Sequence, residues 1–278
     1  MAITNFIPTI WSETLYEQLD KKYIAVANCT RAWEGDIKQC GDRVKICGIG
    51  PVSVFDYTKN QDLPAPTALK DSARELVINQ AKAFNFQIDD IDRAQMKPDI
   101  MNQAMRTAAK ALANYADSYV YSLYTEVDSN HVISATGKSN EEIVDIIIKA
   151  IINFQNIGVH DDLVLEVSPE VASKIYRAKL DLLSDNNDLF ETGCIGSIAG
   201  CKIYVTHNLH TVPEGPFLKY KCFLRTKRAI AFAEQLSEIE AYRPELRFAD
   251  AVKGLYLYGA KIVYPDELKI IEIDDIEN

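Results

Sequence analysis

The longest regular pattern in the chain is a stripe of apolar residues between positions 98 and 124. Apolar side chains recur there at three- and four-residue spacing, which places them on one face of an α-helix. The stripe consists of Met101, Ala104, Met105, Ala108, Leu112, Ala116, Tyr119 and Leu123. Pro98 suits the first helical turn. We predict a helix over residues 98–124, roughly 40 Å long at 1.5 Å per residue.

The second half of the chain alternates helix and strand patterns. Ser139 and Glu142 form a capping box in front of an apolar stripe of helical spacing. Residues 163–167 are an apolar run typical of a buried strand, and Ser168 and Pro169 supply the cap and the first residue of another helix. Further strands are predicted over residues 201–205, 254–264 and 268–273. This succession predicts a mixed α+β fold.

The region before the long helix has an extended character. It follows a short helical pattern with Leu15, Leu19 and Tyr23 on one face. Residues 43–46 then alternate polar and apolar side chains, and the glycines and the proline of residues 48–51 signal a turn.

A second strand is predicted over residues 82–88, where Phe84, Phe86 and Ile88 share one face. Together with the strand before it, this segment predicts an extended hairpin. Two strands with so few apolar residues bury too little surface to be stable alone in water. We therefore expect a neighbouring copy of the same subunit to cover the hairpin.

Composition and charge narrow the possible functions. The chain has 278 residues and a formal net charge of −10, which argues against nucleic-acid binding as its main function. The densest basic stretch, residues 219–228, is interpreted as a strand and turn whose charges face solvent, because too few aromatic side chains accompany it for a base-stacking site. The sequence has no signal-peptide pattern and no apolar run of membrane-spanning length. We expect a soluble protein made in the cytosol, with no membrane partner.

Three carboxylates form the first group of candidate chemical residues. Asp89, Asp90 and Asp92 could bind a divalent cation or act as acid and base. The alternative is that they end a strand and favour the N-terminal end of the following helix, where negative charge is stabilised. We favour the second interpretation.

Histidines and cysteines form the second group. His207 and His210 could ligate a metal together with Cys201, but they lie in a segment that reads as a loop. Reduced thiols are expected in a chain without an export signal. The paired cysteines are spaced more widely than zinc knuckles, so we interpret all six as buried or incidental: Cys29, Cys40, Cys47, Cys194, Cys201 and Cys222. We predict no catalytic residue, no cofactor and no metal site.

Five stretches resemble a known family in their order along the chain. They are residues 6–11, 34–36, 41–44, 84–95 and 247–263. They resemble the major capsid proteins of tailed phages and prophages, which share the Hong Kong 97-type fold with bacterial encapsulin shells. The resemblance extends over nearly the whole chain. It implies an N-terminal arm, an extended hairpin loop, a long spine helix, and peripheral and axial domains.

The resemblance also implies boundaries for these parts. The arm and a short helix would occupy residues 1–33, and the extended hairpin loop with its return strand residues 34–90. The spine helix of the peripheral domain would lie in residues 91–138. The axial domain would comprise residues 139–210, and strands returning to the peripheral domain residues 211–278.

The function that this resemblance implies is structural. Subunits would form pentamers and hexamers and close into an icosahedral head, assembled in the host bacterial cytoplasm, that encloses double-stranded DNA without sequence-specific binding. Family partners would be scaffolding and portal proteins. Because the arm-like sequence begins at Phe6, we expect a separate scaffolding protein or none. An encapsulin-like nanocompartment is the alternative within the fold, and a metal-dependent enzyme using Asp89, Asp90 and Asp92 is the alternative outside it.

The arm and the extended loop are expected to reach over neighbouring subunits and bury aromatic side chains there. The predicted interface residues are Phe6, Trp11, Phe55, Tyr57, Phe84 and Phe86. Some relatives join subunits through a lysine–asparagine isopeptide bond. Lys59 and Asn60 lie in the extended loop, but no partner acid can be identified, so self-crosslinking is not predicted.

Overall fold

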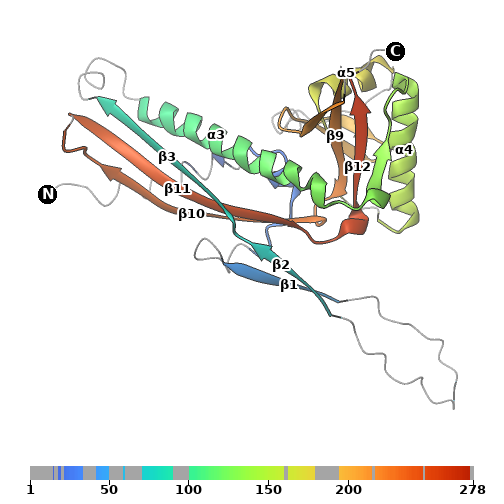
Figure 1. Cartoon of the computed structure of the whole chain (residues 1–278), viewed down its shortest axis with the longest axis horizontal. Coiled ribbons are helices and arrows are strands. Elements are labelled where there is room, and N and C mark those ends of the chain that lie inside the picture. The colour runs from blue at the N-terminus through green and yellow to red at the C-terminus, as the bar shows by residue number, and fades with distance from the viewer. Residues whose placement is uncertain are drawn as a thin grey trace.

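The protein combines three β-sheets with one long helix and several short ones. The computed structural model describes residues 15, 18, 19, 22–33, 42–49, 59, 71–89, 100–159, 162–178, 194–214, 217–246 and 248–275. Figure 1 shows helix α3 lying along a three-stranded sheet, and a seven-stranded sheet with its helices at one end of the molecule. A two-stranded sheet extends away on the side opposite α3. The predicted mixed α+β fold is confirmed.

The three-stranded sheet and α3 form the long part of the molecule. The strand order is β10, β11, β3, and neighbouring strands are antiparallel. The bounds are Ile230–Tyr242 for β10, Ala249–Ile262 for β11, Gln80–Asp89 for β3 and Ile100–Ser122 for α3. The predicted long helix is therefore confirmed, although the 3-10 helix η3 (Leu123–Glu126) takes up its last predicted residues.

Strand β3 shows the alternation that its sequence predicted. Every second side chain is half-buried and the others are exposed, so Phe84 and Phe86 lie on one face, with ring centroids 6.1 Å apart. Both rings pack against the main core of their own chain. A Cβ atom at Gly254 would lie 2.4 Å from the Phe84 ring, so β11 needs a glycine where this ring crosses it.

The seven-stranded sheet is mixed. Its order is β4, β12, β9, β5, β7, β6, with β8 pairing along another part of β9. The β4–β12 and β5–β7 pairs are parallel, and the others are antiparallel. The bounds are Val132–Ser134 for β4, Leu163–Val167 for β5, Cys194–Ile198 for β6, Cys201–Val205 for β7, Thr211–Glu214 for β8, Phe217–Thr226 for β9 and Leu268–Asp274 for β12. All five residues of β5 are buried, as its apolar run predicted.

Two helices beside this sheet begin where their caps predicted. In α4 (Asn140–Asn156), the Ser139 side chain accepts a hydrogen bond from the Glu142 backbone, and the Glu142 carboxylate accepts one from the Ser139 backbone. In α5 (Pro169–Arg177), the Ser168 side chain caps the first turn. Short 3-10 helices complete the elements: η1 (Val26–Asn28), η4 (Ser129–His131) and η5 (Pro265–Glu267).

Strands β1 (Arg43–Ile49) and β2 (Asp71–Val77) form a hairpin. Its base packs against the body of the chain, and the contact forms a second, smaller hydrophobic core. Four hairpin residues are buried against four residues of the β10–β11 region. They are Val44, Ile46, Leu76 and Ile78 on one side and Ala231, Ala233, Leu257 and Val263 on the other. A Cβ atom at Gly259 would lie 2.3 Å from the Val77 carbonyl oxygen, so a glycine allows this close approach.

Three expectations about the hairpin were wrong. Residues 82–88 are not its second strand: they lie in β3, which pairs with β11, whereas β1 pairs with β2. The base of the hairpin, expected to be covered by a neighbouring copy, is buried against its own chain. The turn expected over residues 48–51 does not begin at Gly48, because Gly48 pairs with Ser72 and Ile49 with Asp71 in the β1–β2 ladder. The cross-strand hydrogen bonds outweigh the local turn preference of glycine.

Leu76→Ala is expected to lower the free energy of unfolding by about 3 kcal/mol, because the wild-type side chain is fully buried in this small core and its removal leaves a cavity. The control is Glu75→Ala at the neighbouring exposed position, expected to change stability by no more than about 0.5 kcal/mol. Urea unfolding of the unassembled subunit measures both. Equal effects would show that the hairpin base is not part of the folded body.

The first described residues join the main core. Leu15 and Leu19 are helical and fully buried, and Tyr23 is almost fully buried, as the predicted helix face requires. The main core is continuous from these residues through α3 and α4 into both larger sheets. The two ends of the molecule are therefore one packed unit.

Candidate functional site

The residues singled out for chemistry do not come together in a reactive site. Asp89 is the last residue of β3, where the strand-end interpretation placed it; Asp90 and Asp92 lie outside the described residues. His207 and His210 lie in the irregular segment between β7 and β8, and the His210 ring stacks on Tyr124 at 4.8 Å. Within the described ranges, no three His, Cys, Asp or Glu side chains are placed to hold a metal ion.

The described cysteines are buried free thiols. Burial raises the pKa of Cys29 to about 11 and that of Cys222 to about 12, and Cys201 is also buried. A thiol with a raised pKa is a poor nucleophile and a poor metal ligand. Cys40 and the side chains of Cys47 and Cys194 lie outside the described residues.

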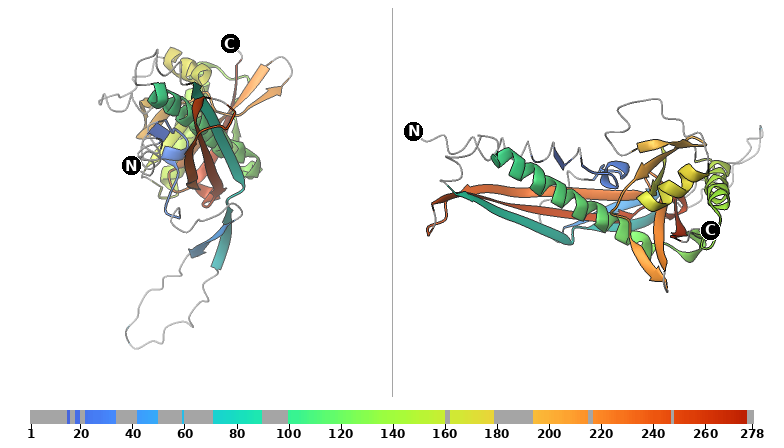
Figure 2. Two further views of the ribbon diagram at one scale, coloured as in Figure 1. Left: turned by 90° about the vertical axis from the view of Figure 1, so that its left-hand side faces the viewer. Right: turned by 90° about the horizontal axis from the view of Figure 1, so that it is seen from above.

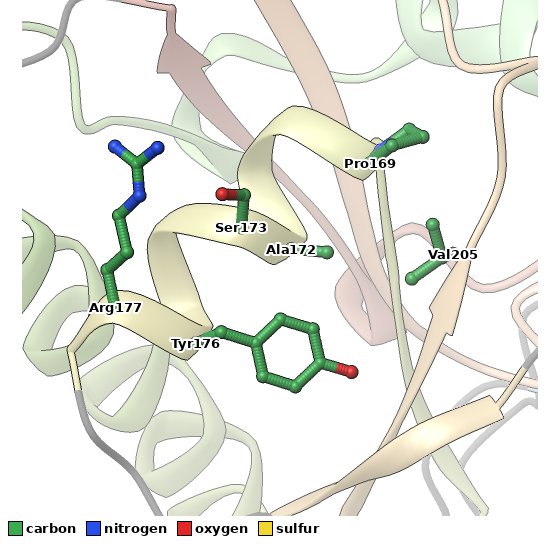
Figure 3. A pocket seen from close by; sticks show the side chains of 6 residues that line it. All are labelled: Pro169, Ala172, Ser173, Tyr176, Arg177 and Val205. Carbon is green, nitrogen blue, oxygen red and sulfur yellow. The ribbon is translucent and has the colours of Figure 1, made fainter.

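A groove of about 540 Å³ lies beside α5. Figure 3 shows the Tyr176 ring extending from α5 toward the side of the groove where Val205 ends β7, whereas Arg177 points to the opposite side. The remaining lining residues are Pro169, Ala172 and Ser173. The lining contains no carboxylate, histidine or cysteine, so it offers no general acid, base or metal ligand. Among the described helices, none combines the length and hydrophobicity needed to cross a bilayer.

Several buried polar groups gather instead around one segment near the N-terminus, among them Asn28, Asp117, Glu166, Arg225 and Glu234. We call residues 22–31 the junction segment. Figure 2 shows it (blue) beside α3, at the end of the helix nearer the seven-stranded sheet. It contacts α3 and both larger sheets through hydrogen bonds, and three sets of side chains hold it.

Arg225 from β9 and Glu166 from β5 form the first set. Both side chains are fully buried and make a two-point ion pair, with Nη2–Oε1 at 2.8 Å and Nε–Oε2 at 3.0 Å. Arg225 also donates to the backbone carbonyl groups of Ala25 and Asn28, and the Asn28 side chain donates to Glu166. The seven-stranded sheet is thereby attached to the junction segment.

This ion pair corrects the expectation that the charges of residues 219–228 face solvent. Arg225 is fully buried, and Lys221 is buried and paired with Glu272 of the neighbouring strand β12. A cation can be buried when a carboxylate on an adjacent strand satisfies it. The signal available in the sequence was Glu166, a carboxylate within the apolar run that predicted a buried strand, because such a group needs a partner.

Asp117 from α3 forms the second set. Its two carboxylate oxygens accept hydrogen bonds from the backbone N–H groups of Ile24 at 3.0 Å and Val26 at 3.1 Å. Burial raises the pKa of Asp117 to about 7, although the backbone donors oppose the shift. Helix α3 is thereby attached to the same segment by a group whose pKa lies near neutrality.

Tyr23, Arg31 and Glu234 form the third set, with Tyr256. The Tyr23 hydroxyl and the Arg31 guanidinium both donate to the Glu234 carboxylate of β10, and the Tyr23 and Tyr256 hydroxyl oxygens lie 2.8 Å apart. Thr30 exchanges two backbone hydrogen bonds with β10, at Ile230 and Phe232. The three-stranded sheet is thereby attached to the junction segment as well.

Stability is expected to fall as pH rises toward neutrality because of Asp117. Its pKa is raised from 3.8 to about 7, so the folded chain holds a proton that the unfolded chain releases, and this contribution is lost as pH rises from about 4 to about 7. Between about pH 5.5 and pH 8 the loss is about 2 kcal/mol. Asp117→Asn should remove this component from the pH profile of urea unfolding. An unchanged profile would show that Asp117 is ionised throughout.

Of the predicted interface residues, Phe6, Trp11, Phe55 and Tyr57 lie outside the described residues. Phe84 and Phe86 are half-buried, so part of each ring is open to a neighbour. Two strongly exposed apolar side chains, Leu246 and Phe248, were not singled out from the sequence.

Comparison with known proteins reveals the fold but no close relative. No protein-family model matches the chain, and no curated protein matches its sequence. A chain in a structure of Mycobacterium phage Che8 is 24% identical, with 90% of each chain covered and a TM-score of 0.65. The capsid of Ralstonia phage GP4 gives 12% identity, 91% and 90% coverage and a TM-score of 0.69. The SrpI encapsulin complex from Synechococcus elongatus gives 10% identity, 87% and 85% coverage and a TM-score of 0.59. The fold expected from the sequence resemblance is confirmed over most of the chain.

Proposed function

We propose that this chain, which has the Hong Kong 97-type fold, is a major capsid protein that assembles into an icosahedral phage head around double-stranded DNA. The observation that carries the proposal is the likeness over about nine-tenths of the chain to a phage capsid chain of almost the same extent. On this proposal the protein is not an enzyme and has no cofactor. The mature location is the virion, with assembly in the host bacterial cytoplasm.

The proposed mechanism is mechanical. Copies of the chain form closed rings of five and six, and symmetry repeats each modest contact many times over the shell. The junction segment holds α3 and both larger sheets together, so the body can act as one rigid tile. The net charge of −10 is compatible with a shell that encloses DNA without binding it tightly.

The parts of the tile are proposed with the boundaries expected from the sequence. We propose an arm in residues 1–33, an extended loop in residues 34–90, a spine-helix segment in residues 91–138, an axial domain in residues 139–210 and return strands in residues 211–278. The seven-stranded sheet, which combines strands of the axial domain with β4 of the spine-helix segment and with β8, β9 and β12 of the return strands, would lie around the ring axis. The aromatic side chains proposed to contact neighbours are Phe6, Trp11, Phe55, Tyr57, Phe84 and Phe86. Scaffolding and portal proteins would be the other partners.

Negative-stain electron microscopy and light-scattering mass of the purified chain test this function. The chain is examined alone and after co-expression with the proteins encoded by neighbouring genes. Closed particles, or rings of five and six copies, are the expected result. A chain that stays monomeric under both conditions would contradict the proposal.

An encapsulin-like nanocompartment is the second candidate, because the chain also matches the SrpI encapsulin complex. It would use the same subunit contacts but enclose a cargo enzyme in place of a genome. Neighbouring genes separate the two: portal and terminase genes favour a phage head, and a gene for a cargo enzyme favours a nanocompartment. Particle diameter gives an independent indication.

A further inference from the structure

Two buried carboxylates face the junction segment, but a cation satisfies just one of them. Glu166 of β5 and Asp117 of α3 are both shielded from water. Arg225 donates two hydrogen bonds to Glu166. The Asp117 oxygens accept hydrogen bonds from the backbone N–H groups of Ile24 and Val26, and no lysine or arginine of the described ranges forms an ion pair with them. Backbone N–H groups carry no net charge, so an ionised Asp117 stays uncompensated.

Arg225 cannot serve both carboxylates, because all of its donors are used. A guanidinium carries five N–H groups. Two of those in Arg225 bond to Glu166, two bond to carbonyl groups of the junction segment, and one bonds to the Cys29 thiol. When Asp117 ionises, the cluster of two carboxylates and one guanidinium therefore holds an excess of negative charge away from water, which is costly.

The other titratable groups beside Asp117 supply no further positive charge. Tyr121 lies one turn farther along α3, and Cys29 lies in the junction segment. Burial raises the pKa of both, so they stay neutral near pH 7. Glu166 and Arg225 are on neighbouring strands and can keep their ion pair whether or not the segment covers them. The charged groups at the far end of the segment pair with one another: Arg31 and Glu234.

The middle of the junction segment can leave the body without unfolding it. Tyr23 on one side donates to Glu234, and Thr30 on the other side exchanges two backbone hydrogen bonds with β10. Residues 24–29 lie between these two anchors and are held through their backbone groups by Asp117 and Arg225. The β5–β9 and β9–β12 ladders beneath them do not involve the segment. Residues 24–29 are therefore a unit that can open locally.

We propose that the charge of Asp117 controls a local opening of the junction segment: residues 24–29 stay closed while Asp117 is protonated and detach from the body when it ionises. In the open state water reaches the Asp117 carboxylate, which removes the cost of burying it. The body is then rigid at mildly acidic pH and loosens between α3 and the seven-stranded sheet as pH rises past neutrality. This behaviour belongs to the single chain and does not depend on the proposed function.

Hydrogen exchange of the unassembled full chain, followed by NMR at about pH 5.5 and about pH 8, tests the opening. The reporters are the backbone N–H groups of Ile24 and Val26, which donate to Asp117. Each rate is corrected for the intrinsic exchange rate at that pH. The protection of both groups should fall about thirtyfold between the two pH values, because the open state releases a proton that the closed state holds.

A reporter in the body shows whether the opening is local. The Thr206 N–H group donates to the Val167 carbonyl group at the end of the β5–β7 pair. At low urea concentrations, Ile24 and Val26 should exchange faster than Thr206 and almost independently of urea, since a local opening exposes little surface. Equal protection and equal urea dependence at all three positions would show that the segment opens by global unfolding, and would overturn the proposal.

Asp117→Asn keeps the shape of the side chain and removes its charge. In this variant the protection of Ile24 and Val26 should agree within about twofold at the two pH values. Asp145→Asn is the matched control, because it removes an exposed carboxylate of α4 and should keep the full change. A change of about thirtyfold that persists in Asp117→Asn would overturn the role of Asp117.

The carboxyl carbon of Asp117 gives a measurement that needs no variant. Its chemical shift in the wild-type chain should titrate between about pH 5.5 and about pH 8. A carboxyl group that is ionised throughout this range would overturn the proposal, even if Asp117→Asn did not fold. Assembly into shells is measured separately, so failure here leaves the proposed function standing.

Discussion

Arg225→Met is expected to lower the free energy of unfolding by about 3–5 kcal/mol, among the largest effects of a single substitution in this chain. The change leaves the fully buried Glu166 carboxylate without its cation and the Ala25 and Asn28 carbonyl groups without a donor. Urea unfolding of the unassembled subunit, followed by circular dichroism, measures the loss.

Two variants make this measurement specific. Arg228→Met removes an arginine whose side chain is 64% exposed and pairs with Glu267, and it should cost no more than about 1 kcal/mol. Glu166→Leu combined with Arg225→Met removes both charges and should be less destabilising than Arg225→Met alone. If Arg225→Met and Arg228→Met have equal effects, the buried pair does not hold the junction segment.

Replacement of residues 50–70 by Asn-Gly is expected to abolish closed shells while leaving the subunit folded. Ile49 and Asp71 are paired at the end of the β1–β2 ladder, so a two-residue turn can join them without disturbing the small core below. The removed segment contains Phe55 and Tyr57, which are proposed to contact neighbours. Electron microscopy measures assembly, and the urea midpoint of the unassembled subunit measures folding.

Lys59→Ala is the matched control within the same segment. Lys59 is exposed, and the sequence predicts no crosslink through it, so this variant should assemble as the wild type does. Phe55→Ala combined with Tyr57→Ala keeps the length of the segment and should weaken the shells. If the shortened chain closed into shells of wild-type stability, residues 50–70 would have no part in holding neighbours together.

On the proposed function, the subunit combines a rigid body with contacts to its neighbours. The junction segment makes the body rigid through buried charges, and residues 50–70 are proposed to contact a neighbour. A subunit that must keep its shape while many copies press on it gains from a rigid body. Because the base of the hairpin is buried against β10 and β11, a force on the hairpin would be transmitted to the three-stranded sheet and from there to Thr30 of the junction segment.

Elements whose pattern is complete within a few residues were predicted correctly. The capping box of α4, the Ser168 cap of α5, the buried strand β5 and the alternating face of β3 all depend on neighbours in sequence. Strand β2 was not singled out, because Asp71–Val77 has no regular alternation. Its strand character comes from pairing with β1 and from the burial of Leu76 and Ile78 against β10 and β11.

The candidate sites show the same division. The sequence predicted correctly that His207 and His210 lie in a loop. It placed the charges of residues 219–228 in solvent, which was wrong for Lys221 and Arg225, because their partners Glu272 and Glu166 are distant in sequence and adjacent only in the sheet. The exposure of Leu246 and Phe248 was not predicted either, because it depends on which other segments of the folded chain pack over these side chains.

The sequence by itself therefore determined the helices, the buried strands and, through motifs spread along the chain, the fold. Local hydrogen bonding and the spacing of apolar residues are properties of short segments, so they can be recognised in the amino-acid sequence alone. Only the tertiary structure decided which charges are buried in pairs, that the hairpin base packs on its own chain, and that Asp117 titrates near neutral pH. Each of these depends on distances between segments far apart in sequence, and on the water that their contact excludes.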